Sequence, residues 1–170
     1  MNTKYLLVDG YNIIFYLKDL KILAEKSLDH ARTRLMEMLT NFSGFTQENI
    51  ILVFDAHKVN GGVENIEHKN NIIVVYTREK ETADTYIERT AKILAKKYTV
   101  RVATSDATEQ IIIIGSGAFV VSAPVFEEEV KTALRNISKI AGKRPIKNNL
   151  LIDNLDKETM EKLEQMRLKL

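Results

Sequence analysis

Residues 4–12, KYLLVDGYN, have the pattern of a strand followed by a turn: an apolar run ends in Asp9, and a glycine comes directly after it. The same pattern returns in ILVFDAH at 51–57 and, after two small polar residues, in VRVATSD at 100–106. Most of the strand-like runs in the chain are continuously apolar rather than alternating, which is typical of parallel strands covered on both faces. Gly10 is expected to permit a sharp turn directly after the first strand.

Working outward, strand-like runs alternate with helical patterns along the chain. Apolar residues recur at three- and four-residue spacings from Ala24 to Phe42, with Gly44 as the expected end of that helix, and again from Ala83 to Tyr98. This alternation predicts an α/β fold: a three-layer sandwich with a central, mostly parallel five-stranded sheet and helices on both faces. The expected strands are Lys4–Val8, Ile50–Phe54, Ile72–Tyr76, Thr99–Ala103 and Ala118–Val121.

The four consecutive isoleucines at 111–114 are ambiguous. Their β-branched side chains favour a strand. However, Ser105 is a good helix N-cap, Glu109 falls early in the segment, and Gly115 is a good helix end. We therefore predict a short buried helix of about eight residues at this place.

Length and composition set broad limits. A chain of 170 residues fits one domain with a real core. It has no cysteine, which excludes disulfides, thiolate catalysis and cysteine-ligated zinc. No signal peptide or membrane span is recognisable, so a cytoplasmic protein without a membrane partner is expected. The formal net charge of +2 is too small to indicate a polyanionic partner by itself.

The C-terminal third carries a basic stretch and then a tail. We expect residues 1–145 to form the domain, and 146–170 to form a tail whose amphipathic helix packs back on it. Before the tail, basic residues recur every four positions without an intervening acid, as in a helix stripe. This stripe is either a solvated helix face or a phosphate-contacting surface. Its members are Lys131, Arg135, Lys139 and Lys143, with Arg144 beside them.

Four aspartates lie where strands end or a helix opens. Asp9, Asp55 and Asp106 follow the first, second and fourth runs, and Asp84 follows the third at the start of a helical pattern. Carboxyl ends of parallel strands share one edge, where ligands bind. Carboxylates gathered there repel by about 4 kcal/mol per pair at ~4 Å, which a hard divalent cation would offset. Oxygen ligands without cysteine favour Mg²⁺ or Mn²⁺ over zinc.

Each acid also has a structural explanation. Asp9 could cap a helix, and Asn12 could orient Asp9 or contact a ligand. Glu81 and Asp84 are three residues apart, so they would share a helix face, although acids also favour a helix start on dipole grounds. His57 could act as a base or a substrate contact, but a lone loop histidine usually does neither. The joint pattern is stronger than any single residue.

The motifs LLVDGYNIIF (6–15), ILVFDAH (51–57), ETADTYIER (81–89) and VATSDATEQ (102–110), with GSGAFVVSA (115–123) after them, resemble in order the YacP-like proteins of the NYN domain family. The resemblance implies a PIN-like fold and a metal-dependent endoribonuclease. In some members it implies one that associates with the ribosome and cuts mRNA under translation.

Carried over by motif, the resemblance implies a catalytic set and a smaller metal-binding set. The implied metal ligands are Asp9, Asp84 and Asp106, and Asn12 joins them as a catalytic residue. Asp55, Glu81 and Ser105 are expected in supporting roles, and the basic stripe is expected to bind RNA. The alternative is a non-catalytic RNA- or ribosome-binding module that uses the stripe. The sequence predicts no oligomeric state.

Overall fold

The structure, a computed structural model, describes residues 3–55, 65–78 and 80–141. Strands and helices alternate as the sequence predicts. Their order is β1 (Lys4–Asp9), α1 (Gly10–Tyr16), α2 (Lys18–Lys26), α3 (Leu28–Thr46), β2 (Asn49–Phe54), β3 (Asn65–Lys69), β4 (Ile72–Tyr76), α4 (Ala83–Leu94), β5 (Thr99–Thr104), α5 (Ala107–Gly115), β6 (Phe119–Ser122) and α6 (Ala123–Ala141).

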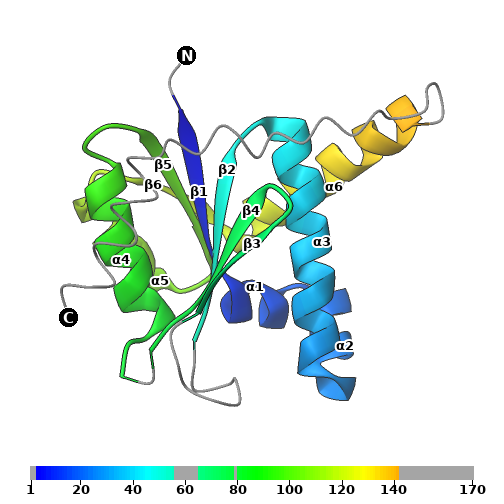
Figure 1. Ribbon diagram of the computed structural model, residues 1–170, viewed down its shortest axis with the longest axis horizontal. Helices are drawn as coiled ribbons and strands as arrows, with labels where there is room; N and C mark the ends of the chain where they lie inside the picture. The colour runs from blue at the N-terminus through cyan, green and yellow to red at the C-terminus, as the bar shows by residue number, and fades with distance from the viewer. Residues whose placement is uncertain (1–2, 56–64, 79, 142–170) are drawn as a thin grey trace.

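One six-stranded sheet forms the middle layer, in the order β3-β4-β2-β1-β5-β6. All neighbouring strands pair in parallel except β3, which pairs antiparallel with β4. Helices α4 and α5 cover one face, and α1, α2, α3 and α6 lie on the other (Figure 1). The predicted three-layer α/β class is therefore confirmed, with β1 near the centre of the sheet.

The apolar runs form strands because both faces of the sheet are covered. Along β1, Leu6 and Val8 enter the core beneath α1, α3 and α6, while Tyr5 and Leu7 enter the core beneath α4. All four side chains have no exposed surface. The alternation of strand side chains between two buried faces removes the polar positions that a one-sided sheet would show.

The sheet has one strand more than the five predicted, and the additional strand is β3. Its sequence, NIEHK, is polar, and its residues are exposed or half-buried because it lies at the edge of the sheet. It pairs with β4 through the short link Asn70-Asn71, and Asn70 adopts a left-handed φ of 56°. Asparagine tolerates that conformation, so the Asn-Asn pair was the available signal for a hairpin.

The helix expected over Ala24–Phe42 is divided in two. Ser27, with φ −160°, separates α2 from α3, and its side chain accepts a hydrogen bond from the backbone of His30 as the N-cap of α3. Helix α3 also continues beyond Gly44 and ends at Gln47, which adopts the left-handed conformation. The apolar periodicity does not reveal the break at Ser27, because this capping residue interrupts the helical backbone without changing the spacing of the buried side chains.

The helix predicted around the four isoleucines is confirmed as α5, but the prediction that it is buried was wrong. Ile113 is fully buried, whereas Ile111 is 73% exposed and Ile114 is 64% exposed. The cap is also different, because Asp106 rather than Ser105 accepts hydrogen bonds from Thr108 N and Glu109 N. An isoleucine run encodes α5, yet only one of its faces packs on the sheet.

The predictions for the C-terminal end of the chain are not tested by the structure. The tail at 146–170 and its amphipathic helix lie outside the described residues, as does the end of the predicted domain at 142–145. Within the part that the structure describes, no helix is both long and apolar enough to cross a membrane.

Candidate active site

The register of the sheet brings the predicted acids to one edge. Asp9, the last residue of β1, pairs with Val53 of β2, so Asp55 follows two positions later on the neighbouring strand. On the other side Val8 pairs with Ala103 of β5, which places the Thr104–Asp106 segment next to Asp9. A cavity of about 520 Å³ opens at this edge. It is lined by Asp9, Tyr11, Asn12, Phe15, Tyr16, Asp55, Thr82, Ala83, Asp84 and Ser105.

Gly10 is required at this edge for a different reason than the expected turn. It is the first residue of α1, and its φ is not in the left-handed region. A Cβ placed on it would lie 2.3 Å from Cε1 of Phe54, well inside the contact limit. Glycine therefore lets α1 start directly against the end of β2, which fixes Asp9 and the first turn of α1 at the cavity.

Three carboxylates converge at this edge: Asp9 and Asp84, which line the cavity, and Glu109 each present an oxygen within 4.8 Å of the other two. We call these three residues the acidic cluster. Asp9 is 7% exposed and also caps α1 by accepting a hydrogen bond from Asn12 N at 3.1 Å. Asp84 reaches the cluster from the first turn of α4, whose N-cap is Thr82. The predicted meeting of Asp9 with Asp84 is therefore seen in the geometry.

Glu109 is the member that the sequence reading missed. Its side chain is 4% exposed, and neither carboxylate oxygen makes a well-formed hydrogen bond with the described residues. Burial raises its pKa to about 7; a contact with the Thr104 hydroxyl opposes this, and the negative charges of Asp9, Asp84 and Asp106 add to it. A buried carboxyl group without a cationic partner is costly to ionise, so it is poised to bind a cation.

The electrostatics of Asp84 follow the same logic. Although the side chain as a whole is exposed, desolvation of its carboxyl group raises the pKa, and the charges of Asp106 and Asp55 raise it further. A hydrogen bond with Asp9 lowers it in part. The two neighbouring carboxyl groups are thus close enough for one cation to contact both.

Asp106, rather than Ser105, caps α5. The Asp106 side chain is exposed, and its Oδ1 accepts the capping hydrogen bonds. Asp106 is not one of the three clustered carboxylates, although it is close enough for its charge to act on Asp84 and Glu109. Ser105 instead donates from both its backbone N and its Oγ to Asn12 Oδ1, each at 2.6 Å. Its contacts support the loop between β5 and α5.

Asn12 is oriented by those two hydrogen bonds. Because a backbone N–H can only donate, the atom facing Ser105 must be the side-chain oxygen Oδ1. That oxygen already accepts two hydrogen bonds, so the amide nitrogen is the polar group that Asn12 has left for a ligand. Asn12 lines the cavity, and an amide N–H suits a phosphate oxygen rather than a metal.

Of the other residues considered in the sequence, Asp55 lies at the cavity and Glu81 does not line it. Asp55 lines the cavity and is half-buried there. Glu81 precedes the N-cap of α4, so it shares no helix face with Asp84, and its carboxylate pairs with Arg89 at 2.8 Å. His57 lies outside the described residues.

None of the described members of the basic stripe, Lys131, Arg135 and Lys139, lines the cavity. Helix α6 begins where β6 ends and runs back along the sheet, so each residue after Ala123 lies about 1.5 Å farther from that edge (Figure 1). Lys131 pairs with Glu127 at 2.7 Å, and Arg135 donates to Thr132 Oγ1 at 3.1 Å. Lys139 lies in the last turn, and Lys143 and Arg144 are outside the described residues.

A signal for Glu109 was present in the sequence but had a second meaning. Asp106 and Glu109 have the spacing of a capping box, in which the second residue hydrogen-bonds back to the backbone of the first. In the structure Asp106 N donates to Thr104 Oγ1 instead, which leaves the Glu109 carboxylate to turn toward the cluster. Only this alternative bond, which depends on the loop geometry, distinguishes a cap from a site residue.

Comparison with known proteins agrees with the motifs. Residues 6–168 match the YacP-like NYN domain. The chain is 41% identical over 145 residues to the Bacillus subtilis protein "Uncharacterized protein YacP", covering 82% of this chain and 85% of that protein.

Solved structures of the same relative agree with the fold. The crystal structure of Rae1 (YacP) from Bacillus subtilis has 36% sequence identity and a TM-score of 0.71, over 99% of this chain and 96% of that one. A point mutant of Rae1 gives 34% identity and a TM-score of 0.72, over 96% and 97% of the two chains. The chain thus belongs to the YacP-like NYN domain family, whose members are PIN-like, nuclease-like domains.

Proposed function

We propose that this protein is a metal-dependent endoribonuclease that cleaves RNA phosphodiester bonds with Mg²⁺ or Mn²⁺ held by Asp9, Asp84 and Glu109. The family supports a nuclease-like protein acting on RNA. The acidic cluster supports the metal, because its donors are carboxylate oxygens, the ligands that these hard cations prefer.

The observation that carries the proposal is that three carboxylates gather at one place, with the buried Glu109 among them. At 4.8 Å and an effective dielectric of ~20, two ionised carboxylates repel by about 3 kcal/mol per pair. No Lys or Arg is among the described residues that line the cavity. Glu109 is buried without a well-formed hydrogen bond, and the Thr104 hydroxyl only partly opposes the rise of its pKa. A divalent cation is the simplest partner for such a set.

The surrounding residues have separable tasks in this proposal. A bound cation would supply the positive charge that stabilises the phosphoryl group and favours ionisation of an attacking water. Asn12 would donate its amide N–H to a phosphate oxygen, since its Oδ1 is held by Ser105. Asp55, half-buried at the cavity, would orient water or ligand from the outer shell. Asp106 would preserve the start of α5 and so the position of Glu109.

The proposed substrate is mRNA in a ribosome-associated context, which the family resemblance suggests. The direct comparison is cleavage of one transcript while it is translated and as naked RNA. Cleavage during translation alone would make the ribosome part of the substrate; equal cleavage of both would remove it from the mechanism.

The test of catalysis is the Asp84→Asn variant, with Glu88→Gln on the same helix as its control. Loss of outer-shell partners of a metal costs 10–100-fold, so loss of a direct ligand should lower cleavage by at least ~100-fold. The exposed Glu88 is outside the cluster, and its variant should cleave as wild type does. Cleavage of RNA by pure Asp84→Asn protein at the wild-type rate, or wild-type cleavage that survives EDTA, would refute the proposal.

Two further variants compare the metal sets. If Glu109 is a ligand, Glu109→Gln should lose activity as Asp84→Asn does, whereas Asp106→Asn should retain more, because asparagine can still cap α5. The opposite order would restore Asp106 as the third ligand. Retained RNA binding by wild type without any metal-dependent cleavage would instead favour the non-catalytic binding module.

A further inference from the structure

Aromatic side chains form part of the cavity that Asp9 and Asp84 of the acidic cluster line. Phe15 is 44% exposed and Tyr16 is 40% exposed, and both line the cavity together with Asp9 and Asp84. Single exposed aromatic residues are common on protein surfaces. Here two of them stand next to each other on α1, at the same opening as the carboxylates, which calls for a specific explanation.

Phe15 is held in place by a row of rings that leads into the core. It stacks on Tyr11 with centroids 6.3 Å apart and an interplanar angle of 26°. Tyr11 packs against Phe54 at 5.0 Å, and Phe54 stacks on Tyr76 at 5.6 Å. The Tyr11 hydroxyl accepts a hydrogen bond from Arg32 at 2.8 Å. An exposed ring on such a support loses little freedom when a flat ligand stacks on it.

The charge of the cavity limits how RNA could be held there. Among the described residues, its lining contains three aspartates and neither Lys nor Arg. The described lining therefore offers no basic side chain to a phosphate, the usual source of affinity for nucleic acids. The exposed aromatic rings instead offer contacts to the base of a nucleotide.

We infer that Phe15 and Tyr16 are a stacking platform that binds unpaired bases of the RNA next to the scissile phosphate, so that the enzyme selects single-stranded RNA. This inference rests on the proposed function. Both faces of a base in a duplex are covered by its neighbours, whereas an unpaired base can stack on a side chain. Successive helix positions do not face each other, so the two rings offer surfaces to separate bases.

The experiment compares Phe15→Ala with Phe45→Ala. Phe45 is 41% exposed, close to the value for Phe15, but it lies in the last turn of α3, just before β2 begins, at the opposite edge of the sheet. The readouts are kcat and KM on a short single-stranded RNA and on a duplex of the same sequence. Binding of the labelled single strand is measured in the Asp84→Asn background, which separates binding from cleavage.

Loss of one base–aromatic stack should raise KM and Kd for the single strand by roughly 5- to 100-fold while kcat changes little. Phe15→Trp should restore both values, which a merely structural role of Phe15 would not explain. Phe45→Ala should behave as wild type, and the duplex should be a poor substrate throughout. Equal effects of Phe15→Ala and Phe45→Ala, or duplex cleavage as efficient as single-strand cleavage, would overturn the inference.

The outcomes also separate this inference from the proposed function. A wild type that cleaves no RNA but binds single strands in a Phe15-dependent manner would refute the nuclease and support the platform. A wild type that cleaves with EDTA sensitivity, but with KM unchanged in Phe15→Ala, would support the nuclease and refute the platform.

Discussion

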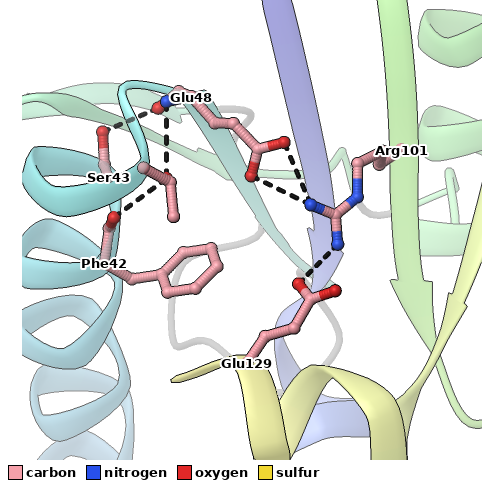
Figure 2. Close-up of polar contacts among 6 residues, drawn as sticks. Phe42, Ser43, Glu48, Arg101 and Glu129 are labelled. Carbon is pink, nitrogen blue, oxygen red and sulfur yellow. Dashed lines mark hydrogen bonds and ion pairs between the residues drawn. The ribbon is translucent and has the colours of Figure 1, made fainter. Parts of the chain in front are cut away.

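The molecule contains two groups of converging acids, and they are treated in opposite ways. In the first, Glu48 and Glu129 share the guanidinium of Arg101 (Figure 2). We call these three residues the arginine network. In the second, the acidic cluster, no described Lys or Arg lines the cavity beside Asp9 and Asp84. The fold thus supplies an arginine to the first set of carboxylates, whereas the described lining of the cavity supplies neither Lys nor Arg to the second.

In the arginine network, every charged side chain is paired with one of opposite charge. Glu48, 4% exposed, accepts from Arg101 Nη1 at 3.1 and 3.3 Å, and its backbone carbonyl accepts from Ser43 Oγ at 2.7 Å. Burial tends to lower the pKa of Arg101, but Glu129 and Glu48 outweigh it and hold that pKa above its ordinary value. Each charge therefore has a partner, and the network links the connection between α3 and β2 to β5 and α6.

The source of the counter-charge therefore distinguishes structural acids from functional ones. A buried carboxylate whose counter-charge comes from the same chain stabilises that chain and needs no ligand. Buried carboxylates without such a partner reduce stability until a ligand arrives, a cost that folds accept at functional sites. Removing the partner from the first set should therefore harm stability, and supplying a partner to the second should improve it.

The largest stability effect should come from Arg101→Met. It leaves Glu48 buried and unpaired, and breaking one side of a buried pair costs about 3 kcal/mol of unfolding free energy or more. Urea denaturation measures the loss. Adding Glu48→Gln to the variant should recover most of it, because no uncompensated charge is then buried. A loss below ~0.5 kcal/mol, the usual range of surface substitutions, would place this pair among the weak ones.

Next in size is the stabilisation by Mg²⁺ or Mn²⁺ near neutral pH. Binding to the folded state alone raises the unfolding free energy by about 2.7 kcal/mol at 100 times the dissociation constant. Thermal unfolding with added metal, and again after EDTA, measures the gain and its reversal. The Arg101→Met variant should keep the full gain because its defect lies elsewhere. An equal gain in Asp84→Asn would show that the metal binds outside the acidic cluster.

The sequence could predict most of the fold and only part of the site, for physical reasons that particular residues illustrate. Runs such as Leu6–Val8 are buried on both faces, so composition alone identifies them as strands. The polar edge strand β3 carries no such mark. At the site, Asp9 and Asp84 follow from strand ends and helix starts. Glu109 does not, because whether an acid caps a helix or faces a cavity depends on tertiary contacts made by Thr104.

The smallest effect, and the sharpest for the acidic cluster, is the pH dependence of Glu109→Gln in metal-free protein. Burial first, and then the neighbouring negative charges, raise the folded-state pKa of Glu109 to about 7, against about 4.3 in the unfolded chain. The folded state therefore holds the extra proton between these values, and the stabilisation present below pH ~4.3 is lost as the pH rises through about 7.

Glutamine resembles the protonated acid, so in EDTA the stability of the variant relative to wild type should rise by about 2.5 kcal/mol between pH 5 and pH 8. Urea unfolding at both pH values measures the difference. A difference that stays constant with pH would mean that the Glu109 charge is already compensated within the chain, as that of Glu48 is by Arg101. Glu109, the most buried member of the acidic cluster, would then resemble Glu48, and the main reason to place a cation at the acidic cluster would be lost.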